Sequence, residues 1–195
     1  MARMSSSLTY ALFDSALGEC ALAWSDAGVA RVWLPEALPG RLRVRLSRDA
    51  TMGSEAQPAG EIASAIGDIQ ALLRGVRVDL GAVRIDDSRI DAFDRGVYAA
   101  ARLIPAGRVV TYAVLAERIG AGALAARAVG QSLGRNPFPI VVPCHRIVAA
   151  RGELGGFSAP GGAATKRRLL AIEDARLDDG NDLFDATPMA PVPGA

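Results

Sequence analysis

The chain opens with hydrophobic and polar positions that alternate with period two. Leu8, Tyr10 and Leu12 alternate with smaller residues, and two further apolar runs, ECALAW and GVARVWLP, flank the turn sequence Ser-Asp-Ala-Gly at 25–28. Short alternating runs separated by a turn are typical of antiparallel strands. We therefore predict that the first 35 residues form a small sheet.

The pattern then changes period. Residues 39–58 follow neither the strand nor the helix period, and an irregular segment is predicted there. Apolar positions recur at helical spacing from Ile62 to Leu73, and the helix is predicted to end at Gly75. A short strand-like stretch follows at 76–85.

From residue 91 onward the period is helical. One helix carries Phe93, Val97 and Ile104 on a single face, and VVTYAVLAERIG has Thr111 as its expected N-cap. After the small-residue turn AGA comes LAARAVGQSLG, and a last helix, ATKRRLLAIEDA, follows a glycine-rich loop. Two short helices joined by a glycine-containing turn predict a helix-turn-helix, although any helical bundle contains such pairs.

These patterns predict an α/β (α+β) domain with a small sheet at 1–90 and an α-helical domain at 91–177. The acidic, proline- and alanine-rich composition of 178–195 predicts a disordered tail. No apolar run approaches the roughly 20 residues of a membrane span, and the N-terminus lacks the apolar core of a signal peptide. Two cysteines, one in each half, make no disulfide framework, so we expect an intracellular setting.

Charge is unevenly distributed along the chain, although the net charge is only +1. Residues 1–94 carry −3, residues 95–170 carry +9 and residues 171–195 carry −5. A basic block favours a polyanionic partner, because neutralising phosphates releases counterions. A solvated basic face would give the same count, so charge alone does not decide.

Within the basic block, IVVPCHRIVA places Cys144 beside His145, the only histidine. A zinc site of Cys and His normally needs four ligands, and with Cys20 the chain offers three. No G-x-G-x-x-G follows a predicted strand, so a dinucleotide fold is not supported. We predict neither a metal nor a cofactor.

The Cys-His dipeptide itself has more than one interpretation. A cysteine hydrolase needs the base within reach of the sulfur, but adjacent residues in an extended segment point to opposite faces. A turn at Pro143 and one bridging water would close the gap. Glu173 shares the apolar face of Leu169 and Leu170 and needs a partner there, for which His145 is the candidate. A buried core pair with a solvated glutamate is the alternative.

The sequence RNPFPIVVPCHRIVAARGELGGFS, with the downstream ATKRRLLAIED, resembles the O6-alkylguanine-DNA alkyltransferases, also called methylated-DNA–protein-cysteine methyltransferases. The upstream IPAGRVVTYAVLAERIG and AARAVGQSLGRNP resemble the helix-turn-helix of that family in order and spacing. ALGECALAWSDAGVARVWLP resembles, more loosely, its N-terminal domain, which implies a ribonuclease-H-like fold for residues 1–90. The resemblance extends over 8–175 and is strong over 91–175.

The resemblance implies DNA repair by direct damage reversal. The thiolate of Cys144 would take the alkyl group, chiefly methyl, from O6 of a guanine flipped out of the stack, once per molecule and without cofactor. The implied partner is double-stranded DNA, bound through its minor groove by a monomer. The implied location is the cytoplasm, at the nucleoid. The alternative is a relative that binds lesions without transfer; such relatives typically replace the reactive cysteine.

The resemblance also implies catalytic roles. Cys144 would be the nucleophile and alkyl acceptor, His145 the base acting through water, and Glu173 the residue that orients His145. Asn136 would brace the active-site turn. Tyr112 would turn the nucleotide and donate toward guanine N3.

Further residues match the DNA-binding and pocket positions of the family. Arg127 would fill the vacated stack, and the small Ala125, Ala126 and Gly130 would let the helix approach the groove. Lys166 would anchor the pocket-closing loop, and backbone N–H groups of the reactive turn, at Cys144 and Ile147, would receive guanine O6. The expected lesion pocket is lined by Leu133, Pro139, Ile147, Phe157 and Ser158. Phe157 stands where a tyrosine is frequent, and Ala159-Pro160 lengthens the loop that follows.

Overall fold

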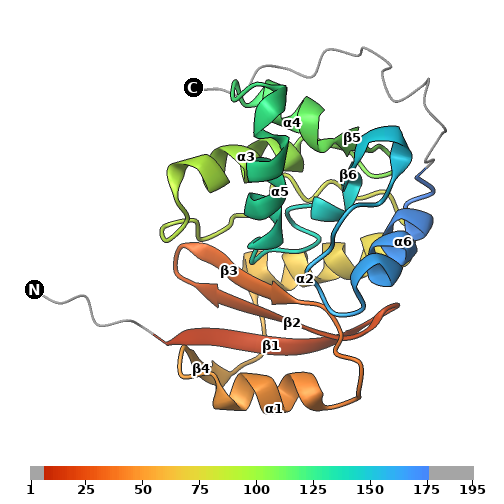
Figure 1. Cartoon of the computed structure of the whole chain (residues 1–195). Coiled ribbons are helices and arrows are strands. Elements are labelled where there is room, and N and C mark those ends of the chain that lie inside the picture. The colour runs from red at the N-terminus through yellow and green to blue at the C-terminus, as the bar shows by residue number, and fades with distance from the viewer. Residues whose placement is uncertain (1–6, 176–195) are drawn as a thin grey trace, which may run out of the picture.

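The computed structural model describes residues 7–175, and the tail predicted at 178–195 lies outside them (Figure 1). The elements of the first half are β1 (Leu8–Ser15), β2 (Gly18–Ser25), β3 (Gly28–Trp33), α1 (Arg41–Arg48), β4 (Met52–Glu55) and α2 (Gly60–Leu73). The strands form one sheet in the order β3-β2-β1-β4, in which β1 is antiparallel to β2, β2 to β3, and β4 is parallel to β1. The predicted small sheet is confirmed.

Both faces of this sheet are covered. Alternate residues of β2 point to opposite faces, so that Leu22 joins the core on the α2 side while Ala21 and Ala23 pack with α1. Figure 1 shows the sheet between α1 and α2. The α2 side faces the second half of the chain and supports the site.

The prediction that residues 39–58 are irregular is wrong. It forms helix α1 and strand β4, the latter paired with β1. Leu42 and Leu46, one helical turn apart, are each 1% exposed against the outer face of the sheet. Burial of these two leucines stabilises a helix whose remaining positions are mostly arginine.

The prediction of a strand-like stretch at 76–85 is also wrong. The segment is irregular apart from an isolated bridge between Ile85 and Val29 of β3. The N–H of Val29 donates to the Arg84 carbonyl at 2.9 Å, and three other carbonyls of the segment accept from Nη2 of Arg102. Those carbonyls belong to Leu80, Gly81 and Val83.

The second half is built mainly of helices. Its elements are α3 (Ala92–Arg102), β5 (Val110–Thr111), α4 (Tyr112–Arg118), η1 (Ala123–Ala125), α5 (Ala126–Gly134), η2 (Cys144–Arg146), β6 (Ile147–Val148), η3 (Ala150–Gly152) and α6 (Gly162–Ile172). The N-cap prediction is confirmed, since the N–H of Val114 donates to Thr111 Oγ1 at 3.2 Å. Helices α4 and α5 pack together as a helix-turn-helix. Phe93, expected inside, is 38% exposed, whereas Val97, one turn later in α3, is buried as expected.

One buried cluster joins the two halves. It includes Leu22 and Ile69 from the first half and Val97, Leu115 and Leu169 from the second. The reactive turn therefore rests on a core to which both halves contribute. Among residues 7–175, no helix has the length and apolar character needed to cross a membrane.

Candidate active site

Cys144 lies at a sharp turn between α5 and β6. Pro143, with φ −80° and ψ 63°, leads into the 3-10 turn η2, where Cys144 is 9% exposed and its thiol is free. The N–H of Arg146 donates to the Pro143 carbonyl at 2.9 Å. The turn expected at Pro143 is present, but the following residues are helical rather than extended.

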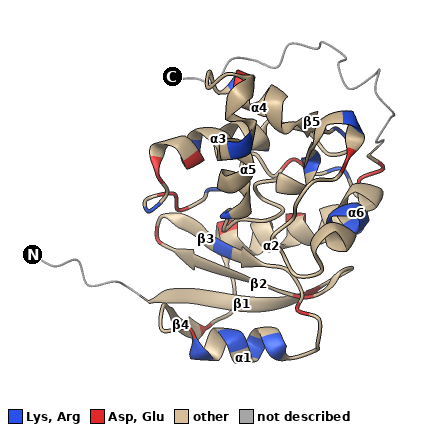
Figure 2. Ribbon diagram, in the orientation of Figure 1, with Lys and Arg blue, Asp and Glu red and all other residues tan. Residues whose placement is uncertain are grey.

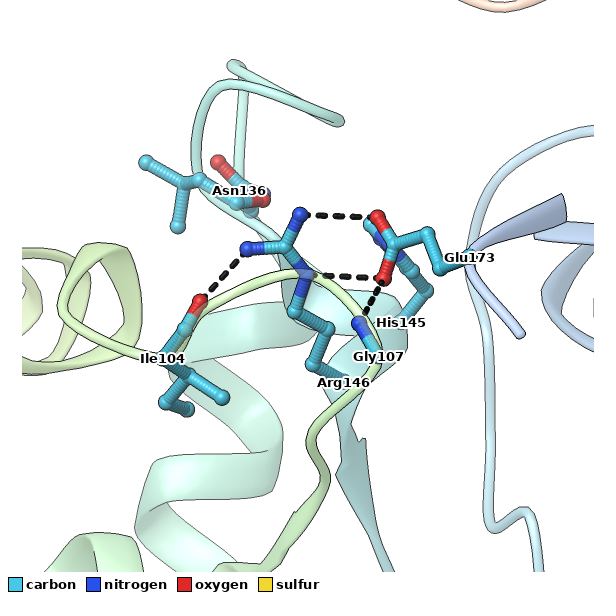
Figure 3. A network of polar contacts seen from close by, with 7 residues as sticks. Ile104, Gly107, Asn136, His145, Arg146 and Glu173 are labelled. Atoms are coloured by element: carbon cyan, nitrogen blue, oxygen red, sulfur yellow. Dashed lines mark hydrogen bonds and ion pairs between the residues drawn. The ribbon is translucent and has the colours of Figure 1, made fainter. Parts of the chain in front are cut away.

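Two side chains and a backbone amide converge on one buried carboxylate (Figure 3). Oε1 of Glu173, at the C-terminal end of α6, lies 2.9 Å from His145 Nε2. Arg146 donates to Oε2 from Nε at 2.9 Å and to Oε1 from Nη2 at 2.7 Å, while its Nη1 donates to the Ile104 carbonyl. The N–H of Gly107 lies 3.5 Å from Oε2. Each carboxylate oxygen thus has two donors.

Glu173 is held in its ionised form. Burial by itself would raise the pKa of its carboxyl, but hydrogen bonds and charge from His145 and Arg146 outweigh burial and lower that pKa to about 2. Gly107 has φ +82°, and a Cβ there would lie 3.0 Å from the Glu173 carbonyl oxygen, so glycine is required beside the carboxylate. Such a buried network is strongly destabilised when one partner is removed.

The imidazole of His145 is fully buried and neutral at neutral pH. Burial lowers its pKa, and the Glu173 carboxylate opposes this without restoring the ordinary value. Because Nε2 faces a carboxylate, the ring proton is assigned to Nε2, which leaves Nδ1 as the basic nitrogen. Nδ1 is buried and has no hydrogen-bond partner within residues 7–175. In the same range, His145 belongs to no group of three His, Cys, Asp or Glu side chains that could hold a metal ion.

The thiol of Cys144 is subject to opposing influences. Burial raises its pKa, while the side chain of Asn136, the charge of Lys166 and nearby backbone N–H groups lower it. Asn136 also donates from Nδ2 to the Val142 carbonyl at 3.0 Å and accepts from the N–H of Phe138 at 2.9 Å. Asn136 therefore lies across the loop that leads into the reactive turn, next to the sulfur.

The two backbone amides expected to hold guanine O6 are already engaged. The N–H of Cys144 donates to the Val142 carbonyl at 2.8 Å, and that of Ile147 donates to the Cys144 carbonyl. Both bonds belong to the tight turns at the ends of η2. In this conformation neither amide is a free donor, and the expectation is corrected accordingly.

A pocket of about 450 Å³ opens beside the thiol. Three of the five expected lining residues border it, namely Pro139, Phe157 and Ser158. Leu133 and Ile147 do not, because α5 and β6 turn these two side chains into the core, where they are 5% and 0% exposed. The pocket is thus bordered on one side by the loop after β6.

Comparisons with known proteins show which family this chain belongs to. Residues 92–175 match the family described as 6-O-methylguanine DNA methyltransferase, DNA binding domain. The crystal structure of Mycobacterium tuberculosis OGT in complex with DNA is 30% identical, with a TM-score of 0.66 over 85% of this chain and 92% of that one. The chain belongs to the 6-O-methylguanine DNA methyltransferase family. The O6-methylguanine-DNA methyltransferase of Pyrococcus kodakaraensis is 25% identical, with a TM-score of 0.65 over 84% of this chain and 98% of that one.

Curated relatives of this chain carry the name methylated-DNA–protein-cysteine methyltransferase. The relative from Mycolicibacterium paratuberculosis is 46% identical over 99 residues, and that from Salmonella typhimurium is 47% identical over 81 residues. These matches cover 51% and 42% of this chain, and 58% and 46% of the relatives' own lengths. The chain therefore matches about half the length of these curated relatives.

In this methyltransferase fold, α5 carries the residues expected to meet DNA. Arg127 is exposed in the first turn of α5, with the half-buried Ala125 and Ala126 beside it and Gly130 one turn later. A Cβ at Gly130 would lie 3.7 Å from the Tyr112 ring, an ordinary contact. Nothing inside the fold requires glycine at this position.

Lys166 occupies a more central place than a loop anchor. Its Nζ donates to the Ile147 carbonyl at 2.6 Å and lies 5.7 Å from the centre of the Tyr112 ring. Burial lowers the pKa of Lys166 to about 8, against the charge of Cys144, which raises it. The hydroxyl of Tyr112 lies 3.5 Å from the Gly156 carbonyl oxygen. Lys166 thus ties α6 to β6 beneath the tyrosine expected to meet the nucleotide.

Sequence reasoning missed the contribution of the first half of the chain to the pocket. Arg31, Trp33 and Arg45 border it, and the Arg31 guanidinium lies 5.0 Å from the Trp33 ring centre. Arg135 borders it as well, and its Nη2 is 2.8 Å and 3.0 Å from the two carboxylate oxygens of Asp94. Figure 2 shows further basic residues along α1, on the far side of the sheet from α4 and α5.

Proposed function

We propose that this protein repairs DNA by transferring the alkyl group, chiefly methyl, from O6-alkylguanine to Cys144. One observation carries the proposal: the buried Cys144 directly precedes His145 in the reactive turn, and Nε2 of that imidazole faces the ionised Glu173, which leaves Nδ1 as the basic nitrogen. The step forms a sulfur–carbon bond and breaks the carbon–O6 bond, whose electrons stay on guanine. A thioether has no facile leaving route, so the transfer is irreversible and each molecule acts once.

The polar network supplies the proton transfers. His145 accepts the thiol proton at Nδ1 through one bridging water, and Glu173 stabilises the imidazolium that forms. Lys166 favours the thiolate through its charge. Guanine takes up a proton as it leaves, with the Tyr112 hydroxyl as the donor toward N3. No cofactor enters this scheme.

Binding to double-stranded DNA is assigned to α5 in the minor groove. Arg127 enters the stack that the flipped nucleotide leaves, while Ala125, Ala126 and Gly130 allow close approach. The minor groove offers little sequence readout, which suits a protein that must find lesions in any sequence. The protein is proposed to act as a monomer, in the cytoplasm at the nucleoid.

The two halves have different tasks in this proposal. Residues 91–177 bind DNA and accept the alkyl group, with Asn136 as the brace of the reactive turn. Residues 1–90 border the pocket. Phe157, packed against the core, keeps the wall of the lesion pocket apolar without a hydroxyl donor, which affects rate and alkyl range rather than the chemistry.

A duplex that carries one O6-methylguanine with a radiolabelled methyl group tests the proposal. Wild type should take up label to about one methyl group per molecule, because a thioether blocks further turnover, and Cys144→Ser should take up none. Tight duplex binding without labelled protein would identify a lesion-binding module and refute the transfer. Catalytic turnover on acyl substrates would identify a hydrolase.

A further inference from the structure

The turn before α5 exposes an apolar side chain to water. Leu124, in η1, is 101% exposed, and among residues 7–175 the next most exposed large hydrophobic residue, Leu38, is 58% exposed. The residues that precede Leu124, from Gly120 to Ala123, are small and exposed. An apolar side chain in water gains free energy when a partner surface covers it.

The backbone holds Leu124 in a defined position. The N–H of Ala125 donates to the Gly122 carbonyl at 3.0 Å, and η1 continues directly into α5, which packs on α3 and α4. Leu124 precedes Arg127 by three residues, a spacing that places both exposed side chains on one face. In Figure 1 α4 lies at the end of the molecule away from the sheet, and α5 runs from that end back toward β3.

We propose that Leu124 is an apolar wedge that enters the minor groove beside Arg127 and packs into a base step next to the flipped nucleotide. This inference rests on the proposed function. Proteins that kink DNA from the minor groove commonly insert leucine or another apolar side chain between base pairs. The charge of +9 over residues 95–170 favours DNA over a second copy of the chain as the partner of this surface. Partial unstacking by the wedge also makes the neighbouring nucleotide easier to flip.

The test uses Cys144→Ser protein, so that the lesion is not consumed, and a duplex with O6-methylguanine beside 2-aminopurine. Adding Leu124→Ala should weaken binding roughly tenfold, about the effect of uncovering most of one leucine side chain. The rise in 2-aminopurine fluorescence on binding should be smaller, since only the part of the unstacking that the wedge causes is lost. The slope of log Kd against log salt should stay unchanged, because no phosphate contact is removed. Leu38→Ala is the matched control and should behave like its parent.

A second readout separates the wedge from the thiol chemistry. With Cys144 intact, Leu124→Ala should take methyl from free O6-methylguanine base at the wild-type rate, which also shows that the variant folds. The wedge would be refuted if Leu124→Ala left duplex affinity and the fluorescence response unchanged. It would also be refuted if binding weakened with a shallower salt slope, or if the substitution affected only self-association of the protein. Failure of wild type to transfer methyl would overturn the proposed function instead, without altering the comparison of Leu124 with Leu38.

Discussion

Glu173 is the residue on which the reactive turn depends, because it neutralises Arg146 and orients His145 at the same time. Glu173→Gln keeps the size but removes the charge. Arg146 would then be buried without a counter-ion, and the free energy of unfolding should fall by about 3–5 kcal/mol. Urea unfolding measures this loss, with the exposed Glu153→Gln as the control. A loss no larger than that of the control would show that the carboxylate does not hold the arginine.

The same network predicts how stability depends on pH. The pKa of Glu173 is about 2 in the folded protein and ordinarily 4.5, so its contribution is complete above pH 4.5 and lost between pH 4.5 and 2. The pKa of His145 lies below its ordinary 6.5, so the unfolded chain takes up that proton first and stability declines as pH falls below 6.5. Urea unfolding across this range should show both declines, and Glu173→Gln should reduce the more acidic one, to which Asp49 and Asp86, whose pKa values are also lowered, still contribute. An unchanged acidic decline in that variant would assign it to other carboxyl groups.

Lys166 makes a separate prediction about the thiol. Lys166→Met removes a positive charge that lowers the pKa of Cys144, so alkylation of Cys144 by iodoacetamide at pH 7 should slow, while Lys166→Arg should retain most of the rate. Because the pKa of Lys166 is about 8, its charge is lost above that pH, and the rates of wild type and Lys166→Met should converge there. The exposed Arg167→Met is the control. A constant ratio across pH would mean that Lys166 acts through packing alone.

Among the elements, α1 shows why the spacing of apolar residues alone was not enough to predict secondary structure. In RLRVRLSR the apolar residues Leu42, Val44 and Leu46 alternate with arginine or serine, as in a strand, while the two leucines are also one helical turn apart. The structure uses the helical pair and leaves Val44 49% exposed. The choice depends on the outer face of the sheet, which offers a surface for two leucines and is not visible in the local pattern.

This assignment predicts a contrast between two positions of one helix. Leu46→Ala should reduce the free energy of unfolding by about 2–5 kcal/mol, because it leaves a cavity against the sheet. Val44→Ala, on the exposed face, should change it by less than about 0.5 kcal/mol. Urea unfolding of the two variants provides the comparison. Equal effects would indicate that α1 does not pack through its leucines.

For the molecule as a whole, the sequence predicted chemistry better than long-range packing. The contact of His145 with Glu173 was predictable because one imidazole and one acid on an apolar face each needed a partner. The border that Arg31 and Trp33 give to the pocket was not, because it depends on how β3 meets a loop about a hundred residues later in the chain. Helices with strong periodicity and caps were predicted from the sequence. The structure of segments that depend on distant partners was not, as at 76–85, where Arg102 donates to the backbone carbonyls.

The core shared by the two halves leads to a prediction about the whole chain. Because one buried cluster runs from Leu22 to Leu169, the halves should unfold in a single step. Both tryptophans, Trp24 and Trp33, lie in the first half, so their fluorescence reports on it, while alkylation of Cys144 reports on the second. The urea midpoints of the two signals should coincide. If fluorescence changed at lower urea while Cys144 stayed protected, the first half would be an accessory to an independently stable second half, and its residues at the pocket could be lost without exposing the thiol.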